Sequence, residues 1–396
     1  MQPQRVAVIG VGQTPFRSQR PDKTYVELAQ DAAKAALDDA GMTPDEIDAV
    51  VFSMAPTQFM GVNDCEKWAV DSIWAAGKPL LRVHTGGATG GSALQAGYTH
   101  VASGLFRTVL VVGADRVSET PDAQHVLNLI WDRFYEHDCA LNTVTMTALA
   151  TQRQMHMYGT TEEQFARVVV RARRNAMLND NAHLKGHISV EDVLNSPRVA
   201  YPYHLFDICP RSAGAAAMIL ADGEVTAARC TRPAFVNGIG AVTQTVFMGD
   251  KVGPKAETEY ADLGELEIAA RDCYAHAGIT DPRKQIQVVE LYDPFSSMQF
   301  PQMESLGFCA RGEAARLSDE GAFDIGGRWA VSPSGGTLCA NPIGVSGLVR
   351  GIEAALQVMG RAGAYQAKGV HMALATAIGG SAQFFTCTAF GDDYTR

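Results

Sequence analysis

The sequence predicts an α/β fold in which one layered unit occurs twice, so that helices and sheets alternate in five layers (αβαβα). Two internal similarities predict it. A helix followed by a buried strand occurs near residue 27 and again near residue 266, and a glycine-rich turn followed by a helix and a strand occurs near residue 86 and again near residue 341. Strands that alternate with helices favour mostly parallel sheets covered by helices, and a unit that occurs twice indicates duplication.

The first pair of matching segments begins at Glu27 and at Leu266. They read ELAQDAAKAALDDAGMTPDEIDAVVFS and LEIAARDCYAHAGITDPRKQIQVVELYD, and both predicted helices stop at an Ala-Gly pair, at Gly41 and Gly278. Glycine is typical of the residue that follows the last turn of a helix. Thr24 and Glu27 form a capping-box pattern before the first helix, and a strand that ends in glycine, RVAVIG or AFVNGIG, precedes each helix.

The second pair consists of two glycine-rich turns that each lead into a helix. GGATGGSALQAGYTHVASG begins at Gly86 and is followed by the strand TVLVVGAD, while NPIGVSGLVRGIEAALQVMG begins at Asn341 and is followed by VHMALATAIGG. Glycine-rich turns let backbone N–H groups approach a ligand, although they also permit tight turns and close helix packing. Both interpretations of these turns, backbone N–H groups that point into a site and glycines that only allow close packing, stay open at this point.

One long segment has no counterpart in the second half. We predict that residues 118–203 are an inserted domain, that residues 1–117 and 204–229 form the first half, and that residues 230–396 form the second. The insertion contains the predicted helices TVTMTALATQRQMHMYG and EEQFARVVVRARRNAMLN, and the second carries arginines 167, 171, 173 and 174. This cluster fits a solvated helix face and a phosphate-contacting face equally well.

Composition and charge exclude several classes of protein. The chain has 396 residues, of which 46% are hydrophobic and 19% charged, enough for a large core and two or three domain-sized units. A formal net charge of -10 argues against a general nucleic-acid binder, because such proteins gather Lys and Arg against phosphates. The sequence contains no apolar run of about 18 or more residues, so we do not expect a membrane span.

The cysteines and the amino terminus indicate a reducing compartment. The eight cysteines are scattered without a CxxC pair, which fits neither a zinc site nor a disulfide framework. The first residues, MQPQRVAVIG, lead directly into an apolar strand and lack the pattern of a secretory signal. We therefore expect a cytoplasmic protein without a metal ion of its own.

With these segments in place, the chain resembles the thiolase superfamily over almost its whole length, and specifically its sterol-carrier-protein-x or lipid-transfer branch. The insertion and the return strand, YGTTEEQFARVVVRARRNAMLNDNAHLKGHISVEDVLNSPRVAYPYHLFDICPRSAGAAAMIL, look like the loop domain of that branch. The resemblance implies the thiolase fold and a CoA thioester as substrate, with no bound cofactor. In the family the insertion covers the active site and helps to hold CoA, so Arg171 and Arg174 become candidate CoA-binding residues.

The resemblance fails at the family's four reactive positions. The nucleophilic cysteine of thiolases sits after the first glycine-rich turn, at the position of Gly87 in RVHTGGATGGSAL, where no acyl-enzyme can form. The second cysteine corresponds to Ala377 in ATAIGGS, and the histidine of the G-H-P-x-G turn to Asn341 in CANPIGVSG. The histidine of the branch's H-D-C-F element is Tyr292 in ELYDPFSSM.

What remains suits aldol chemistry, in which a β-hydroxyacyl-CoA splits into a carbonyl compound and a shorter acyl-CoA without a covalent intermediate. The family's glycine turns form oxyanion holes, so Gly87, Gly379 and Gly380 are expected around the thioester carbonyl. Tyr292 is the candidate base or acid, although its usual pKa of about 10 makes it a poor base near neutrality. Asn341 would donate to the enolate oxygen or position a water.

Two neighbours complete the predicted site. Asp293 would orient Tyr292, and His84, three residues before Gly87, would reach the cavity. Each of these residues also has a structural interpretation: a buried tyrosine with a satisfied hydroxyl, a structural aspartate, and a packing histidine at the end of a strand.

This pattern resembles the steroid side-chain-cleaving aldolases of the superfamily, in which tyrosines replace the catalytic cysteine and histidine. Those aldolases carry a second tyrosine where this chain has Asn341. The resemblance implies a homodimer formed through sheet edges, and a small partner with a zinc ribbon and an OB-fold that would hold any zinc.

Two other functions stay open at this point. A thiolase or acyltransferase would need another nucleophile, for which Cys339 is the candidate, although free cysteines are commonly buried fillers. Alternatively, the chain is a non-catalytic subunit that binds acyl-CoA or lipid.

Overall fold

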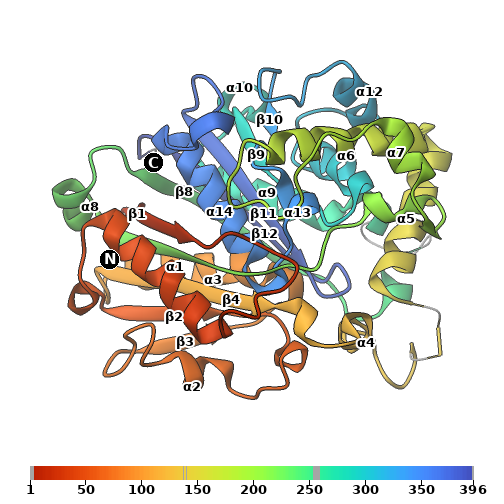
Figure 1. Cartoon of the computed structure of the whole chain (residues 1–396). Coiled ribbons are helices and arrows are strands. Elements are labelled where there is room, and N and C mark those ends of the chain that lie inside the picture. The colour runs from red at the N-terminus through yellow and green to blue at the C-terminus, as the bar shows by residue number, and fades with distance from the viewer. Residues whose placement is uncertain (1–3, 137, 140, 253–258, 395–396) are drawn as a thin grey trace.

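Ten strands form the framework of the molecule (Figure 1). The structure is a computed structural model that describes residues 4–136, 138–139, 141–252 and 259–394. The first half contributes β1 (Val6–Gln13), β2 (Ala49–Ser53), β3 (Leu80–Val83), β4 (Thr108–Arg116) and β7 (Ala213–Asp222). The second half contributes β8 (Ala234–Thr243), β9 (Val288–Glu290), β10 (Ala330–Val331), β11 (Met372–Gly379) and β12 (Phe384–Gly391).

The two halves place their strands in equivalent order. The order is β3-β2-β4-β7-β1 in the first half and β10-β9-β11-β12-β8 in the second. The halves join where β1 and β8 pair antiparallel at Ala7 and Val8. The same order in both halves is what a duplicated unit requires, so the predicted duplicated α/β fold is confirmed.

The expectation of mostly parallel sheets is only half right. Pairs β2–β3, β2–β4, β9–β10 and β9–β11 are parallel, whereas β7 and β12 run antiparallel to both of their neighbours. The reason lies in the connections. The chain enters β7 from the long insertion, and it enters β12 from β11 through a tight turn at residues 380–383. Neither connection is the helical crossover that joins parallel neighbours.

Helices separate and cover the two half-sheets, which gives the five layers. α1 (Tyr25–Ala40) packs on the outer face of the first, and α9 (Gly264–Ala277) on the outer face of the second. α3 (Thr89–Ala102) and α14 (Ile343–Met359) lie between them within one buried cluster. α14 is buried along nearly its whole length because it faces a sheet on either side.

Glycines allow the two central helices to touch. A Cβ on Gly90 would lie 2.2 Å from the backbone nitrogen of Leu348, and one on Gly347 would lie 2.5 Å from that of Gly91. The methyl group of Ala377 packs against the same contact. The amino-terminal ends of α3 and α14 are therefore held side by side, together with the glycine-rich turns that precede them.

The predicted helix ends are confirmed. Thr24 caps α1 in a complete capping box with Glu27. Gly41 and Gly278 end α1 and α9 in the left-handed conformation, with φ of 62° and 64°.

Residues 118–203, predicted as an insertion, are mainly helical. They contain α4 (Ala123–Asn128), α5 (Thr143–Tyr158), α6 (Glu162–Ala176), α7 (Val190–Asn195) and the short strand β5 (Arg198–Ala200), which pairs with β6 (Tyr203–His204). α6 packs on the second half, where the ring centroid of Phe165 lies 5.9 Å from the ring centroid of Phe300 in α11 (Gln299–Ser305). The ends of the two predicted halves, residues 1–3 and 395–396, lie outside the described residues.

The other helices are short and lie around the two half-sheets. They are α2 (Cys65–Ala69), α8 (Gly223–Arg229), α10 (Pro282–Gln285), α12 (Ala314–Asp319) and α13 (Gly336–Cys339). No helix in the described part of the chain has the length and apolarity needed to cross a bilayer.

Candidate active site

A cavity of about 500 Å³ lies where the glycine turns at residues 86–87 and 379–380 meet the insertion. Its walls come from α4 and α5, from the segment 205–211, from the segment 292–298 and from the turns at residues 86–87 and 378–380. Most of the lining is apolar. The polar side chains on it are Gln124, Thr143, Thr147, Cys209, Arg211, Tyr260, Tyr292 and Asn341.

The glycine turn at residues 86–87 packs directly on the turn at residues 379–380. A Cβ on Gly379 would lie 2.0 Å from the carbonyl oxygen of Thr85 and 2.4 Å from the backbone nitrogen of Ala88. Gly86 and Gly380 both have positive φ, 61° and 63°. Only glycine allows this approach, which puts backbone from the start of α3 and from the end of β11 on the same wall.

The phenol of Tyr292 fills the space beside Gly87. A Cβ on Gly87 would lie 2.4 Å from the hydroxyl oxygen of Tyr292 and 2.5 Å from the carbonyl oxygen of Ile378. Both distances are far below a van der Waals contact, so no side chain fits at position 87. The tyrosine hydroxyl lies where a side chain at position 87, in the 3₁₀ turn before α3, would otherwise point.

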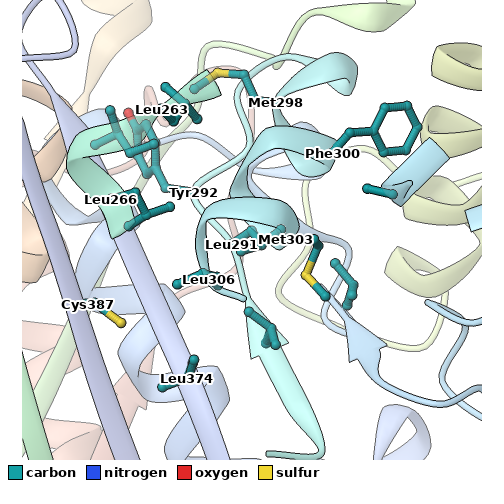
Figure 2. Close-up of a cluster of buried hydrophobic side chains, with 14 of the residues drawn as sticks. Leu263, Leu266, Leu291, Tyr292, Met298, Phe300, Met303, Leu306, Leu374 and Cys387 are labelled. Carbon is teal, nitrogen blue, oxygen red and sulfur yellow. The ribbon is translucent and has the colours of Figure 1, made fainter. Parts of the chain in front are cut away.

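Backbone contacts fix Tyr292 two residues after β9. Its N–H donates to Thr376 Oγ1 over 3.0 Å, and its carbonyl accepts from Gln302 Nε2 over 2.8 Å. The Thr376 hydroxyl donates in turn to Gln302 Oε1 over 2.8 Å, which closes a ring of hydrogen bonds. Figure 2 shows Tyr292 among apolar side chains of a buried cluster that includes Leu263 and Met298. Only 5% of Tyr292 is exposed.

Burial keeps Tyr292 neutral. Loss of solvent raises its pKa well above the usual value, and the nearby Cys209 and Asp115 add to this, while a hydrogen bond from Asn341 acts in the opposite direction. The raised pKa means that the side chain is a phenol, not a phenolate, at neutral pH.

Asn341 connects Tyr292 to a thiol. Its Nδ2 donates to Cys209 Sγ over 3.0 Å, and its side chain acts on the Tyr292 phenol by lowering that group's pKa. The amide is held in place by Ser346, whose hydroxyl donates to Asn341 Oδ1 over 2.7 Å, and by Ser212 Oγ, which accepts from the Asn341 backbone N–H over 3.0 Å. The structure thus brings Tyr292, Asn341, Gly87, Gly379 and Gly380 together.

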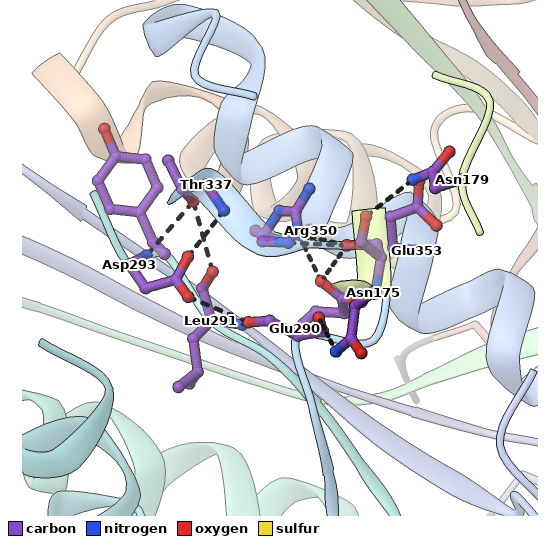
Figure 3. Close-up of polar contacts among 12 residues, drawn as sticks. Asn175, Asn179, Glu290, Leu291, Asp293, Thr337, Arg350 and Glu353 are labelled. Carbon is purple, nitrogen blue, oxygen red and sulfur yellow. Dashed lines mark hydrogen bonds and ion pairs between the residues drawn. The ribbon is translucent and has the colours of Figure 1, made fainter. Parts of the chain in front are cut away.

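The Asp293 carboxylate lies outside the cavity lining and is bonded to other parts of the second half. It accepts from the Thr337 backbone N–H over 2.7 Å and from Gln299 Nε2 over 2.6 Å (Figure 3). Two residues before Tyr292, Glu290 forms a buried ion pair with Arg350 of α14. These contacts fix the chain on either side of Tyr292, but Asp293 does not line the cavity and does not orient the phenol directly.

His84 does not reach the cavity either. It follows β3 and is partly buried, and both burial and the charge of Arg82 lower its pKa. In the segment that follows β3, the first residue to line the cavity is Gly86, two residues after His84.

The structure gives Arg171 and Arg174 partners within the chain, and the prediction that they hold CoA stays a prediction. Arg171 is buried and donates to Ser318 Oγ over 2.7 Å, while Arg174 pairs with Asp324 at 2.8 Å and Arg167 with Asp319 at 2.9 Å. The arginine face of α6 therefore docks on the segment 318–324 of the same chain. Neither predicted residue lines the cavity.

Cys339, the candidate for a replacement nucleophile, lies outside the cavity. It is 1% exposed, and burial raises its pKa to about 12. The cavity thiol is Cys209, which our sequence reasoning missed, and burial raises its pKa to about 12 as well. Arg211, an exposed cation on the cavity wall, was also missed. No local pattern marks either residue, because the segment 205–211 approaches Tyr292 only in the folded chain, where the Cys209 N–H donates to the Pro294 carbonyl over 2.9 Å.

Within the described ranges, no group of three or more His, Cys, Asp and Glu side chains is arranged to hold a metal ion.

The family models and known proteins that the chain resembles agree with this geometry. Residues 6–188 match the model of the thiolase N-terminal domain, and residues 255–391 match that of the thiolase C-terminal domain-like family. The chain is 31% identical over 378 residues to an acetyl-CoA acetyltransferase of Methanothermobacter thermautotrophicus, covering 95% of this chain and 96% of the relative.

Two further matches carry the names of lyases. The chain is 28% identical over 369 residues to a 17-hydroxy-3-oxo-4-pregnene-20-carboxyl-CoA lyase of Mycobacterium tuberculosis, covering 88% of this chain and 91% of the relative. The solved structure of an Ltp2-ChsH2(DUF35) aldolase superposes with a TM-score of 0.81 at 28% identity, covering 99% of this chain and 98% of that one. The chain belongs to the thiolase superfamily, and these two matches make it a lyase-type member of that superfamily.

Proposed function

We propose that this chain is a carbon–carbon lyase that cleaves a β-hydroxyacyl-CoA by a retro-aldol reaction, without a covalent acyl-enzyme. The observation that carries the proposal is the Tyr292 phenol in the space beside Gly87, where thiolases have their nucleophile. For the acyl group we propose a steroid side chain, because the mycobacterial relative is named for such a substrate.

The reaction needs one proton to leave the β-hydroxyl group and one to arrive at the α-carbon. A neutral phenol can serve both ends: its oxygen accepts the hydroxyl proton as its own proton passes to the α-carbon. The electrons of the breaking carbon–carbon bond form the thioester enolate, and the arriving proton quenches it. Tyr292 ends the cycle as a phenol again. The raised pKa of Tyr292 supports this neutral form.

The glycine turns are proposed to stabilise the enolate oxygen. Backbone near Gly87, Gly379 and Gly380 lines the cavity beside the phenol. Preorganised N–H donors in a water-poor site are among the strongest stabilisers of a developing oxyanion. Asn341 is proposed to align the phenol through its side-chain hydrogen bond.

The assembly is also a proposal. β3 is the terminal strand of the sheet, and 43% of Leu81 on it is exposed, which suits pairing with a second copy of the chain. The name of the solved aldolase joins Ltp2 to ChsH2, so we propose a small partner subunit here too, which would hold any zinc. We place the assembly in the cytoplasm.

The two alternatives differ from this proposal in their products. A thiolase would consume free CoA and acylate a cysteine, for which Cys209 is the cavity thiol among the described residues; a raised pKa of about 12 opposes its ionisation. A non-catalytic subunit would bind acyl-CoA and leave it unchanged.

The test is product analysis with a β-hydroxyacyl-CoA, with and without free CoA, on the protein with its partner subunit. The proposal expects equal amounts of carbonyl compound and shortened acyl-CoA, no consumption of free CoA, and no acyl adduct in the intact mass of the protein. Cleavage that depends on free CoA would favour the thiolase, and binding without any cleavage would favour the non-catalytic subunit.

A further inference from the structure

Lys251 is a buried cation that contacts the active-site turn from behind. It follows the 3₁₀ turn Met248–Asp250, between β8 and α9, and 1% of it is exposed. Its Nζ donates to the carbonyl oxygen of Ser381 over 2.8 Å and to the Ser381 hydroxyl over 3.0 Å. Ser381 directly follows the glycine pair Gly379-Gly380, which lines the cavity.

The turn that Lys251 contacts has an unusual backbone. Gly380 and Ala382 both have positive φ, 63° and 52°, and the second is a conformation that residues with a side chain rarely adopt. A hydrogen bond from the Gln383 N–H to the Gly379 carbonyl, 2.9 Å, closes the turn, and the Gln244 N–H donates to the Gln383 carbonyl over 2.7 Å. Such a turn keeps its shape only where the surroundings hold it.

Carboxylates act on the ammonium group electrostatically. Glu265, Glu136 and Asp250 each act on Lys251 as negative charges, and Glu265 and Glu136 are themselves buried. Burial outweighs them and lowers the pKa of Lys251 to about 8. The lysine itself lies outside the cavity lining, so it does not touch the substrate.

We propose that Lys251 is a positioning residue that holds the Gly379-Gly380 turn in the geometry needed to stabilise the thioester enolate. This inference rests on the proposed lyase function for its catalytic meaning, but the restraint on the turn is a property of the free chain. Removal of the cation releases the Ser381 carbonyl and lets the turn sample other conformations.

The test compares Lys251→Met with Lys251→Arg in the full chain with its partner subunit. Lys284→Met is the control, because that side chain is 81% exposed. Hydrogen–deuterium exchange of residues 379–383 is measured without substrate, and kcat and KM are measured with the β-hydroxyacyl-CoA.

We expect exchange in 379–383 to rise about tenfold or more in Lys251→Met, and kcat to fall on the order of tenfold or more with KM nearly constant, because oxyanion stabilisation acts on the transition state. Lys251→Arg, which keeps a donor and a charge, restores both. As pH rises through about 8, the unchanged chain loses the Lys251 proton and kcat falls, whereas Lys251→Arg keeps its rate. If Lys251→Met fails to fold, Ser381→Ala, which removes only the hydroxyl partner, carries the same readouts with smaller changes.

Wild-type exchange and wild-type kcat in Lys251→Met would overturn the inference. If the unchanged chain cleaves no substrate, the proposed function fails, and exchange in 379–383 alone decides the role of Lys251.

Discussion

The hydroxyl oxygen of Tyr292 lies 2.4 Å from the place that a Cβ on Gly87 would take. The two positions are therefore coupled: a tyrosine hydroxyl at this point requires glycine at position 87, and a side chain at position 87 would require a different residue at 292. On this backbone, neither Gly87 nor Tyr292 can be changed without affecting the other position.

Substitution of Gly87 tests this coupling. Gly87→Ala and Gly87→Cys should displace the phenol, abolish cleavage and reduce stability by about 1–3 kcal/mol, the usual cost of overpacking. Gly87→Cys should gain no thiolysis, because the backbone leaves no room for the side chain. Gly326→Ala is the matched control, since a Cβ there meets nothing within 4 Å. Full cleavage by Gly87→Ala, measured with thermal unfolding in parallel, would show that the space is not limiting.

Loss of the Asn341 amide should slow cleavage without unfolding the chain. Asn341→Asp replaces the donor to Cys209 with a carboxylate, which cannot donate when ionised and which opposes any negative charge on the nearby phenol of Tyr292. A lost hydrogen bond of about 1 kcal/mol corresponds to a decrease in kcat of about fivefold. The added negative charge makes this decrease larger. Asn237→Ala removes a buried amide that donates to the Asp393 carbonyl and serves as control. Equal rates for Asn341→Asp and the unchanged chain would remove Asn341 from the site.

The Cys209 thiol should be unreactive at neutral pH. Burial raises its pKa to about 12, so the thiolate fraction grows about tenfold with each pH unit up to that value, and alkylation by iodoacetamide should grow in proportion. The exposed Cys139 provides an internal reference in the same peptide map. Rapid alkylation of Cys209 at pH 7, or an acyl group found on it during turnover, would contradict this assignment and favour the thiolase alternative.

The arginines of α6 should affect stability and not CoA affinity. Arg171→Met leaves the acceptors Ser318 Oγ and Gln299 Oε1 without their donor, at a cost of about 1–3 kcal/mol in unfolding free energy, and should leave KM for acyl-CoA unchanged. Arg174→Gln should have little effect on either quantity, because its ion pair with Asp324 is exposed. A selective increase in KM for Arg174→Gln would support the prediction that Arg174 holds CoA.

Much of the fold could be predicted because its signals are local. The helix caps at Thr24, Gly41 and Gly278 and the repeated glycine-rich turns are set by a few neighbouring residues, and the structure contains them where the sequence predicts them. The direction of β7 and β12 could not be predicted in the same way. It depends on how the insertion and the turn at 380–383 return the chain to the sheet.

The site residues also differ in whether local sequence patterns indicate them. Tyr292 lies just after β9 and Asn341 just before α14, and the repeat in the sequence predicts both of these elements. Cys209 reaches them through a long-range contact with Pro294, which no spacing in the sequence indicates. Arg171 and Arg174 share a helix face by their spacing, but the sequence does not tell that this face packs on residues 318–324 of the same chain.

The rate of β-hydroxyacyl-CoA cleavage by Tyr292→Phe tests the central claim most directly. Phenylalanine keeps the ring in its buried setting and removes only the hydroxyl that moves the proton, so we expect kcat to fall by roughly 10²- to 10⁴-fold with an unchanged unfolding temperature. Tyr158→Phe, which removes a hydroxyl bonded to Asp262 outside the cavity, should keep its rate. Cleavage by Tyr292→Phe at the rate of the unchanged chain would show that the proton moves through another group.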